Sequence, residues 1–307
     1  MKHIQKNSSP VIFQQWVDDN NEQLQEKPTG EAIWDSLHKN KNAKESLQVS
    51  LLEEQGYICA YCGTRIGKKE GETLSVEHFK PKSSFKELTL AYSNLFGCCK
   101  ISQENSKEKS VAFPIAENPN LTALGEIAEW LDIDIENIKT YTYLPRKYNK
   151  NTDLSFENSR KPEAHKITNL TFKANIHHCD DTKGSEPKSI ISPTDADCER
   201  YFQYEKVKYK TGRVGCEIYI PNEGGIIKDT IEILNLNATN LCKDRLNAFR
   251  EGTTTGQQHF DAGYDALTVE EIILNDIYKK KEDNKDGKLK FDAFCFVKAS
   301  IIRSYFE

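Results

Sequence analysis

The strongest constraint on the fold comes from the cysteines, which number nine in a chain of 307 residues. Two of them form a Cys-x-x-Cys pair at Cys59 and Cys62, and three more follow at Cys98, Cys99 and Cys179. The chain opens without a signal-peptide core and contains no apolar run of roughly 18 residues, so we expect a cytosolic protein without membrane contact. Disulfides are disfavoured in that compartment, and clustered cysteines there indicate metal ligands first.

A Cys-x-x-Cys pair supplies only half of the ligands of a tetrahedral zinc site, so a second pair must come from elsewhere in the chain. We expect Cys99 and Cys179 to complete the site with Cys59 and Cys62, and Cys98 is the alternative to Cys99. A redox motif of the thioredoxin type would need a βαβ context, which this segment lacks. The sequence therefore predicts one structural Zn²⁺ ion that joins distant segments.

Apolar patterning divides the chain into three regions. Residues 1–56 are expected to form N-terminal helices, 57–184 a central module, and 185–307 a hairpin followed by a C-terminal helical region. Within the central module, residues 100–176 are too long for a plain loop and are interpreted as a partly helical insertion, with one amphipathic helix over 121–138. The chain is predicted to be α+β and mainly helical.

Glu77 and His78 follow a short strand and pair a hard oxygen ligand with a titratable nitrogen. A carboxylate there can hold a divalent cation, while a histidine with a pKa near neutrality can take a proton from water. Lys80 and Lys82 add positive charge, as a phosphodiester substrate requires. Taken alone, Glu77-His78 is also compatible with an ordinary surface pair, and Asn94 with a cap or turn residue.

The order of these parts resembles the HNH endonuclease superfamily, whose ββα-metal module is stapled by zinc. The resemblance runs from the Cys-x-x-Cys pair through Glu77-His78 to Asn94 and Cys99. It implies that a closing cysteine segment, here 179–184, is displaced from the module by the insertion. Displacement is cheap, because loop closure costs only about 0.6 kcal/mol more per doubling of loop length.

The split module and the segment after it are similar to the nuclease subunits of retron and Septu antiphage systems. Residues 191–202, Gly212, the run 230–237 and Arg245 carry this second resemblance, which covers roughly residues 50–250.

What the resemblance implies is a metal-dependent phosphodiesterase. His78 would be the general base, Asn94 would position it, and Glu77 with Asp180 would hold a catalytic Mg²⁺ or Mn²⁺ ion. Family members usually carry Asn or His where this chain has Asp180. Three neighbouring side chains therefore stay open as substitutes, namely Asp181, His177 and His178.

Basic side chains mark the candidate nucleic-acid contacts. Beside the motif they are Lys80, Lys82 and Lys183, and in the predicted hairpin they are Arg200, Lys206, Lys208, Lys210 and Arg213. Aromatic residues alternate with the second group and could stack on unpaired bases. The alternative is a hairpin that turns these aromatics inward and its lysines outward. The net charge of −5 excludes a uniformly basic surface but not a local basic groove.

We therefore expect an endonuclease that cleaves DNA, or RNA such as tRNA, as the toxic effector of an antiphage system. The resemblance implies control by an ABC-type ATPase and, in retrons, by a reverse transcriptase with its DNA–RNA product. Helices outside 57–184 would contact the ATPase, and the aromatic C-terminal helix would either dock there or pack on its own core. The alternative function is a catalytically silent, zinc-stabilised adaptor of the same defence complex.

Overall fold

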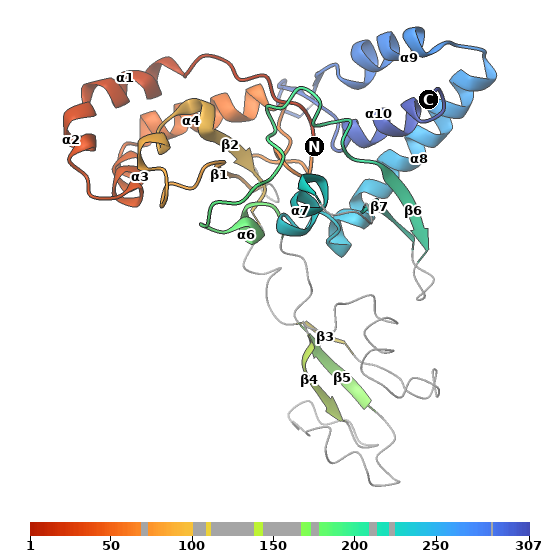
Figure 1. Ribbon diagram of the computed structural model, residues 1–307, viewed down its shortest axis with the longest axis horizontal. Coiled ribbons are helices and arrows are strands. Elements are labelled where there is room, and N and C mark those ends of the chain that lie inside the picture. The colour runs from red at the N-terminus through yellow and green to blue at the C-terminus, as the bar shows by residue number, and fades with distance from the viewer. Residues whose placement is uncertain are drawn as a thin grey trace.

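The computed structural model describes residues 1–68, 73–100, 178–208, 214–220, 225–283 and 285–307, together with the backbone of three short strands in between. The described part is α+β, with helices at both ends of the chain and small antiparallel sheets (Figure 1). No helix among the described residues is long and apolar enough to cross a membrane.

Four helices form the N-terminal region, as the apolar pattern predicts. They are α1 (Val11–Asp19), α2 (Asn21–Gln25), α3 (Gly30–Lys39) and α4 (Lys41–Glu54). Side-chain oxygens cap two of them, since Thr29 accepts from the Ala32 amide and Asn40 from the Ala43 amide. Apolar side chains of α1, α3 and α4 form a second core around Phe13, which Tyr92 and Leu95 of the central module complete.

The central module begins where α4 ends. Gly56 and Tyr57 both adopt positive φ values, so the chain reverses into the turn that holds Cys59 and Cys62. An isolated antiparallel bridge between Ile58 and Arg65 closes this turn.

Two strands carry motif residues of the central module. Strand β1 (Ser75–His78) pairs antiparallel with β2 (Leu95–Cys98), and His78 lies opposite Leu95. Two 3₁₀ turns, η1 (Lys86–Leu88) and η2 (Tyr92–Asn94), lie between them, and helix α6 (Asp180–Lys183) follows the insertion. Buried Gln55 bonds to the backbone of Ile58 and Gly97 and so ties α4 to both the turn and β2.

Most of the insertion lies outside the described residues, including the helix expected over 121–138. Three of its strands are described, and they form one antiparallel sheet in the order β3-β5-β4. Their bounds are β3 (Lys109–Val111), β4 (Ile138–Tyr143) and β5 (Ile167–Phe172).

The C-terminal region contains the expected hairpin and a set of packed helices. The hairpin is β6 (Tyr204–Lys208) paired with β7 (Val214–Ile218). The other elements are α7 (Ile226–Ile233), α8 (Thr239–Asp261), α9 (Ala266–Ile272) continuing as the π-helix η6 (Ile273–Ile277), the short pair β8 (Lys281–Glu282) and β9 (Leu289–Lys290), and α10 (Cys295–Arg303).

Helix α10 packs against α8, and its aromatic side chains face inward. A Cβ on Gly252 or Gly256 of α8 would lie 2.9 Å or less from Lys298, Ile301 or Tyr305, so the glycines permit the close approach. Phe294 and Phe296 belong to the main core. The C-terminal helix therefore packs on its own core. The alternative expectation, that its aromatic face docks to a partner, is wrong.

Candidate metal and catalytic site

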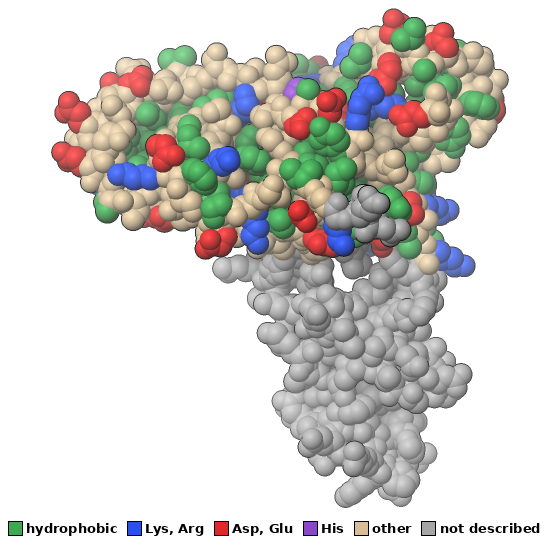
Figure 2. All heavy atoms as spheres, in the orientation of Figure 1, with side chains coloured by type: hydrophobic (Ala, Val, Ile, Leu, Met, Phe, Trp, Pro, Cys, Tyr) green, Lys and Arg blue, Asp and Glu red, His purple; other side chains and the backbone are tan. Residues whose placement is uncertain are grey.

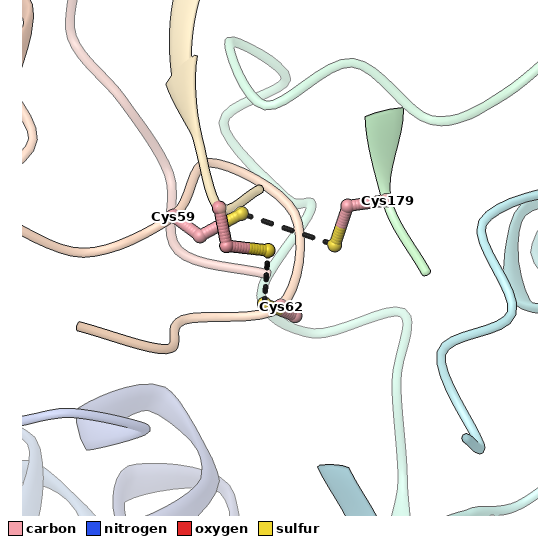
Figure 3. A group of neighbouring side chains, drawn as sticks. Cys59, Cys62 and Cys179 are labelled. Carbon is pink, nitrogen blue, oxygen red and sulfur yellow. Dashed lines mark hydrogen bonds between the residues drawn. The ribbon is translucent and has the colours of Figure 1, made fainter. Parts of the chain in front are cut away.

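Four buried cysteines meet at the centre of the module. Cys59 and Cys62 come from the turn after α4, Cys99 follows β2, and Cys179 precedes α6 (Figure 3). Their sulfur atoms all lie within 4.8 Å of one another. The closest pairs are Cys59 with Cys179 at 3.8 Å and Cys62 with Cys99 at 3.7 Å. The structure thus brings together the four cysteines that the sequence predicts as one group.

The sulfur positions fit a tetrahedral zinc ion. Zinc–sulfur bonds of ~2.3 Å place neighbouring sulfurs roughly 3.8 Å apart in a tetrahedron, which the two closest pairs match. All four are free thiols, and their separation is far from a disulfide bond of ~2.05 Å. Burial alone would raise the pKa of the Cys59 thiol, but hydrogen bonds from its neighbours, led by Cys179, lower it well below its usual range. The donor set therefore suits a soft divalent cation.

Two neighbours of the cluster take other roles. Cys98 is fully buried but does not belong to the group of four, whose member after β2 is Cys99. His178 lies against the cluster, with Nδ1 3.2 Å from the sulfur of Cys179 and 3.5 Å from that of Cys99. Its Nε2 contacts the Asn240 amide at 3.3 Å. His178 therefore belongs with the thiols.

Glu77 lies at the centre of a buried polar network on the other side of β1. Its Oε1 accepts hydrogen bonds from the Lys183 amine and, at 3.1 Å, from the Tyr61 hydroxyl. Asp180, whose Oδ2 accepts from the Ser75 hydroxyl at 3.0 Å, adjoins the Glu77 carboxyl. Two hard carboxylates therefore share one partly closed site, which is the donor chemistry that Mg²⁺ and Mn²⁺ prefer.

The electrostatics of this pair favour an added cation. Burial, and next the hydrogen bond and charge of Asp180, raise the pKa of Glu77 to about 8, although Lys183 opposes the shift. The single positive charge of Lys183 is thus not enough to keep both the Glu77 and Asp180 carboxyls ionised at neutral pH. A divalent ion would supply the missing positive charge.

His78 is held in one tautomer. Its Nε2 lies 3.0 Å from the Thr89 carbonyl oxygen, which can only accept, so Nε2 carries the hydrogen and Nδ1 the lone pair. The Trp34 ring packs edge-on against the imidazole, with centroids 4.6 Å apart. Burial, followed by the charge of Lys82, lowers the pKa of His78 to about 4. The ring is therefore neutral at physiological pH, as a proton acceptor must be.

Asn94 clamps the segment that follows His78. Its Oδ1 accepts from the Lys80 amide at 2.7 Å, while its Nδ2 donates to the carbonyls of Lys80 at 3.0 Å and Leu88 at 3.1 Å. All three bonds reach the loop between β1 and β2. Asn94 therefore fixes the loop backbone at Lys80 and at Leu88, next to Thr89, and none of these bonds is to the imidazole.

The predicted basic contacts occupy very different environments. Lys80 is exposed and Lys82 half-buried, both close to His78 in the chain. Lys183 is the exception, because its side chain is only 1% exposed and its amine bonds Glu77 and the His78 carbonyl. A contact between Lys183 and a nucleic-acid backbone is therefore wrong for this fold.

In the hairpin region, Lys206 and Lys208 are exposed, and Arg200 lies 3.6 Å from Glu270. Lys210 and Arg213 lie outside the described residues. Phe202 and Tyr204 are buried and so cannot stack on bases, whereas Tyr201 is exposed. On the face drawn in Figure 2, basic side chains are scattered among acidic and apolar ones.

Three supporting residues were not predicted from the sequence: Tyr61 and Trp34 act through their side chains and Thr89 through its backbone carbonyl. Tyr61 lies inside the Cys-x-x-Cys pair, Trp34 on α3 and Thr89 in a loop, and nothing in their local sequence sets them apart. Of the open substitutes for Asp180, Asp181 is exposed and His177 lies outside the described residues. Asp180 is thus the described alternative that adjoins Glu77.

Comparison with known proteins shows a distant relationship. The sequence matches no protein-family model. It is similar to the Septu protein PtuB of Bacillus thuringiensis, with 27% identity over 96 residues. That alignment covers 30% of this chain and 34% of the relative, so the chain spans about a third of the protein it matches. The similarity supports a relationship to Septu-type defence proteins.

Proposed function

We propose that this chain is a metal-dependent endonuclease of the HNH type. The observation that carries the proposal is the pairing of a neutral, tautomer-fixed His78 with the carboxyl pair of Glu77 and Asp180. Glu77 and His78 end strand β1, while Asp180 bonds Ser75 at the start of that strand and directly follows Cys179 of the four zinc-compatible thiols. A base beside a hard-cation site is the minimum equipment for hydrolysing a phosphodiester.

In this proposal each residue has one task. His78 accepts the proton of the attacking water at Nδ1, while the Thr89 carbonyl stabilises the imidazolium that forms. Glu77 and Asp180 hold a Mg²⁺ or Mn²⁺ ion, which when bound would neutralise charge on the scissile phosphate and the leaving oxygen. Lys183 balances part of the carboxylate charge, and Asn94 keeps the base loop in place.

The zinc ion would act on structure alone. With Cys59, Cys62, Cys99 and Cys179 as ligands, no position on the ion remains open for water or substrate. It would hold the turn after α4, the end of β2 and the start of α6 together, and so bring Asp180 to Glu77 across a separation of more than 100 residues.

The biological setting we propose is antiphage defence. Similarity to a Septu protein favours a place in a Septu-type system, with an ABC-type ATPase as the controlling partner. Control by a retron reverse transcriptase and its DNA–RNA product is a further part of the proposal. Because residues 294–302 are core, the ATPase would contact other surfaces outside 57–184.

A silent adaptor remains the second candidate, because one observation favours it. The Lys183 amine already bonds Glu77, so the carboxylate has a counterion without any metal. An adaptor would need that arrangement only for stability.

Cleavage assays separate the two functions. Purified full-length chain, alone and with the neighbouring gene products, is incubated with plasmid DNA, single-stranded DNA and tRNA, with Mg²⁺, Mn²⁺ or neither. An endonuclease cuts at least one substrate only when the divalent ion is present. Intact substrates under every condition would support the adaptor.

A further inference from the structure

One face of helix α3 is built to lie against the loop that carries the base. Gly30, Trp34 and His38 recur every four residues and so form one stripe along the helix. A Cβ on Gly30 would lie 2.3 Å from the Lys82 carbonyl oxygen and 2.7 Å from the Thr89 hydroxyl. Glycine is therefore required at the point of contact, and α3 adjoins the residues that surround His78.

The stripe continues from the buried base toward the surface as a row of rings. Trp34 contacts His78 at 4.6 Å and His38 at 5.5 Å between ring centroids, both edge-on. His78 is buried, Trp34 half-buried and His38 exposed. The row therefore marks a direct route along α3 from solvent to the base.

Positive charge gathers along this route. Lys44, from the first turns of α4, places its amine 3.1 Å from Nδ1 of His38. Partial burial and then the charge of Lys44, with a further contribution from Lys82, lower the pKa of His38 against the effect of Asp35. Lys82 also lowers the pKa of His78, so its charge acts on both histidines of the row, His38 and His78.

These cations lack acidic partners among the described residues. The salt bridges found there pair Lys2, Lys6, Lys183, Lys290 and others, but none includes Lys44, Lys80 or Lys82. In a chain of net charge −5, unpaired lysines concentrated beside one buried histidine differ from an ordinary solvated face. Lysines arranged in this way bind phosphates.

We propose that the α3–α4 elbow, through Lys44, His38 and Lys82, binds the phosphodiester backbone of the substrate next to His78. This inference rests on the proposed nuclease function and assigns the N-terminal helices to substrate binding. Lys44 and Lys82 would each neutralise one phosphate, and Trp34, which contacts both His38 and His78, would line the surface between them. The shared chemistry is the phosphate backbone, so DNA and RNA are both candidate ligands.

The test measures binding separately from cleavage. His78→Ala protein, which keeps α3 but lacks the base, is titrated into fluorescein-labelled DNA duplex, single-stranded DNA and tRNA at several salt concentrations. The same background then receives Lys44→Gln with Lys82→Gln. A matched control receives Lys279→Gln with Lys285→Gln, two exposed lysines of the C-terminal region.

We expect the elbow variant to bind more weakly and to lower the slope of log affinity against log salt by about 2, roughly one unit per lost phosphate contact. The control should keep the parent slope. An unchanged slope in the elbow variant, while wild-type protein still cleaves, would overturn the elbow and leave the nuclease intact. Failure of the parent to bind any of the three nucleic acids, together with no cleavage, would overturn both.

Discussion

Replacement of Asn94 by alanine tests whether the loop between β1 and β2 must be held rigid for His78 to work. The three hydrogen bonds of Asn94 to Lys80 and Leu88 are the only side-chain bonds it makes among the described residues, and its side chain is nearly buried. Asn94→Ala removes all three hydrogen bonds, so the loop's backbone groups must hydrogen-bond to water instead.

The magnitude follows from the number of bonds. At a net value of about 1 kcal/mol per hydrogen bond, the loss is about 3 kcal/mol of unfolding free energy. Cleavage should fall further than stability explains, because a displacement of ~1 Å at a catalytic group can cost about 10²-fold in rate. We therefore expect a folded, less stable protein with about 1% of wild-type activity.

The chain offers a matched control at Asn237. Its Oδ1 accepts from the Ile218 amide at 2.8 Å and its Nδ2 donates to the Ile218 carbonyl at 2.9 Å, so it makes the same kind of clamp at the end of β7. Asn237→Ala should cost about 2 kcal/mol for its two bonds and leave the rate per folded molecule unchanged.

Denaturant unfolding gives the stabilities of both variants, and single-turnover cleavage at a temperature where both are folded gives their rates. The reasoning is refuted if Asn94→Ala cleaves like wild type while folded. It is also refuted if both variants lose activity in proportion to their stability, since the clamp would then have no specific link to the base.

Three further predictions concern metals and protons. Wild-type protein purified without chelator should contain one zinc per chain. The Cys179→Ala variant should lack the zinc and unfold at a lower midpoint. Wild-type protein without zinc would disprove the site. Lys183→Met should lower the unfolding free energy by about 1–3 kcal/mol, because it leaves the buried Glu77 carboxyl without its amine partner. Mg²⁺ should restore part of the loss. Equal losses with and without Mg²⁺ would argue against a cation site. The pKa of His78 is about 4 in the folded protein, below its unfolded value of 6.5, so the unfolding free energy should fall by up to about 3 kcal/mol as pH falls from 6.5 to 4. Cleavage should persist below pH 6.5. A loss of activity centred at pH 6.5 would contradict the buried base.

The residues that define the site could be predicted from the sequence, because their chemistry leaves few alternatives. A Cys-x-x-Cys pair in a chain of this kind needs two more soft ligands, and the grouping of Cys99 with Cys179 followed even though 79 residues separate them. The choice of Cys99 over Cys98 depends on the direction of one side chain after β2, which the residue order leaves open.

The supporting residues could not be predicted from the sequence, because their residue types are compatible with many roles. Trp34 looks like any apolar helix residue, and its contact with His78 depends on how α3 packs on the base loop. Lys183 has the composition of a surface contact, but the short α6 helix directs it inward to Glu77. In both cases tertiary packing decides the role.

At the C-terminus, amphipathic patterning predicted the helix but not the surface that its apolar face covers. A row of aromatics fits a partner groove or the protein's own core equally well by periodicity. The glycines of α8 decide between them, since Gly252 and Gly256 admit α10 at a distance that larger residues would prevent.

The central claim is that His78 acts as the base of a metal-dependent phosphodiesterase, and the most direct measurement compares its removal with that of a histidine elsewhere. Cleavage with Mg²⁺ or Mn²⁺ is measured for wild type, His78→Ala and His259→Ala, the last a residue of α8 that stacks on Tyr264. We predict that His78→Ala loses about 10²–10⁴-fold in rate while its zinc content and fold are unchanged, and that His259→Ala cleaves like wild type. Undiminished cleavage by folded His78→Ala would contradict the account.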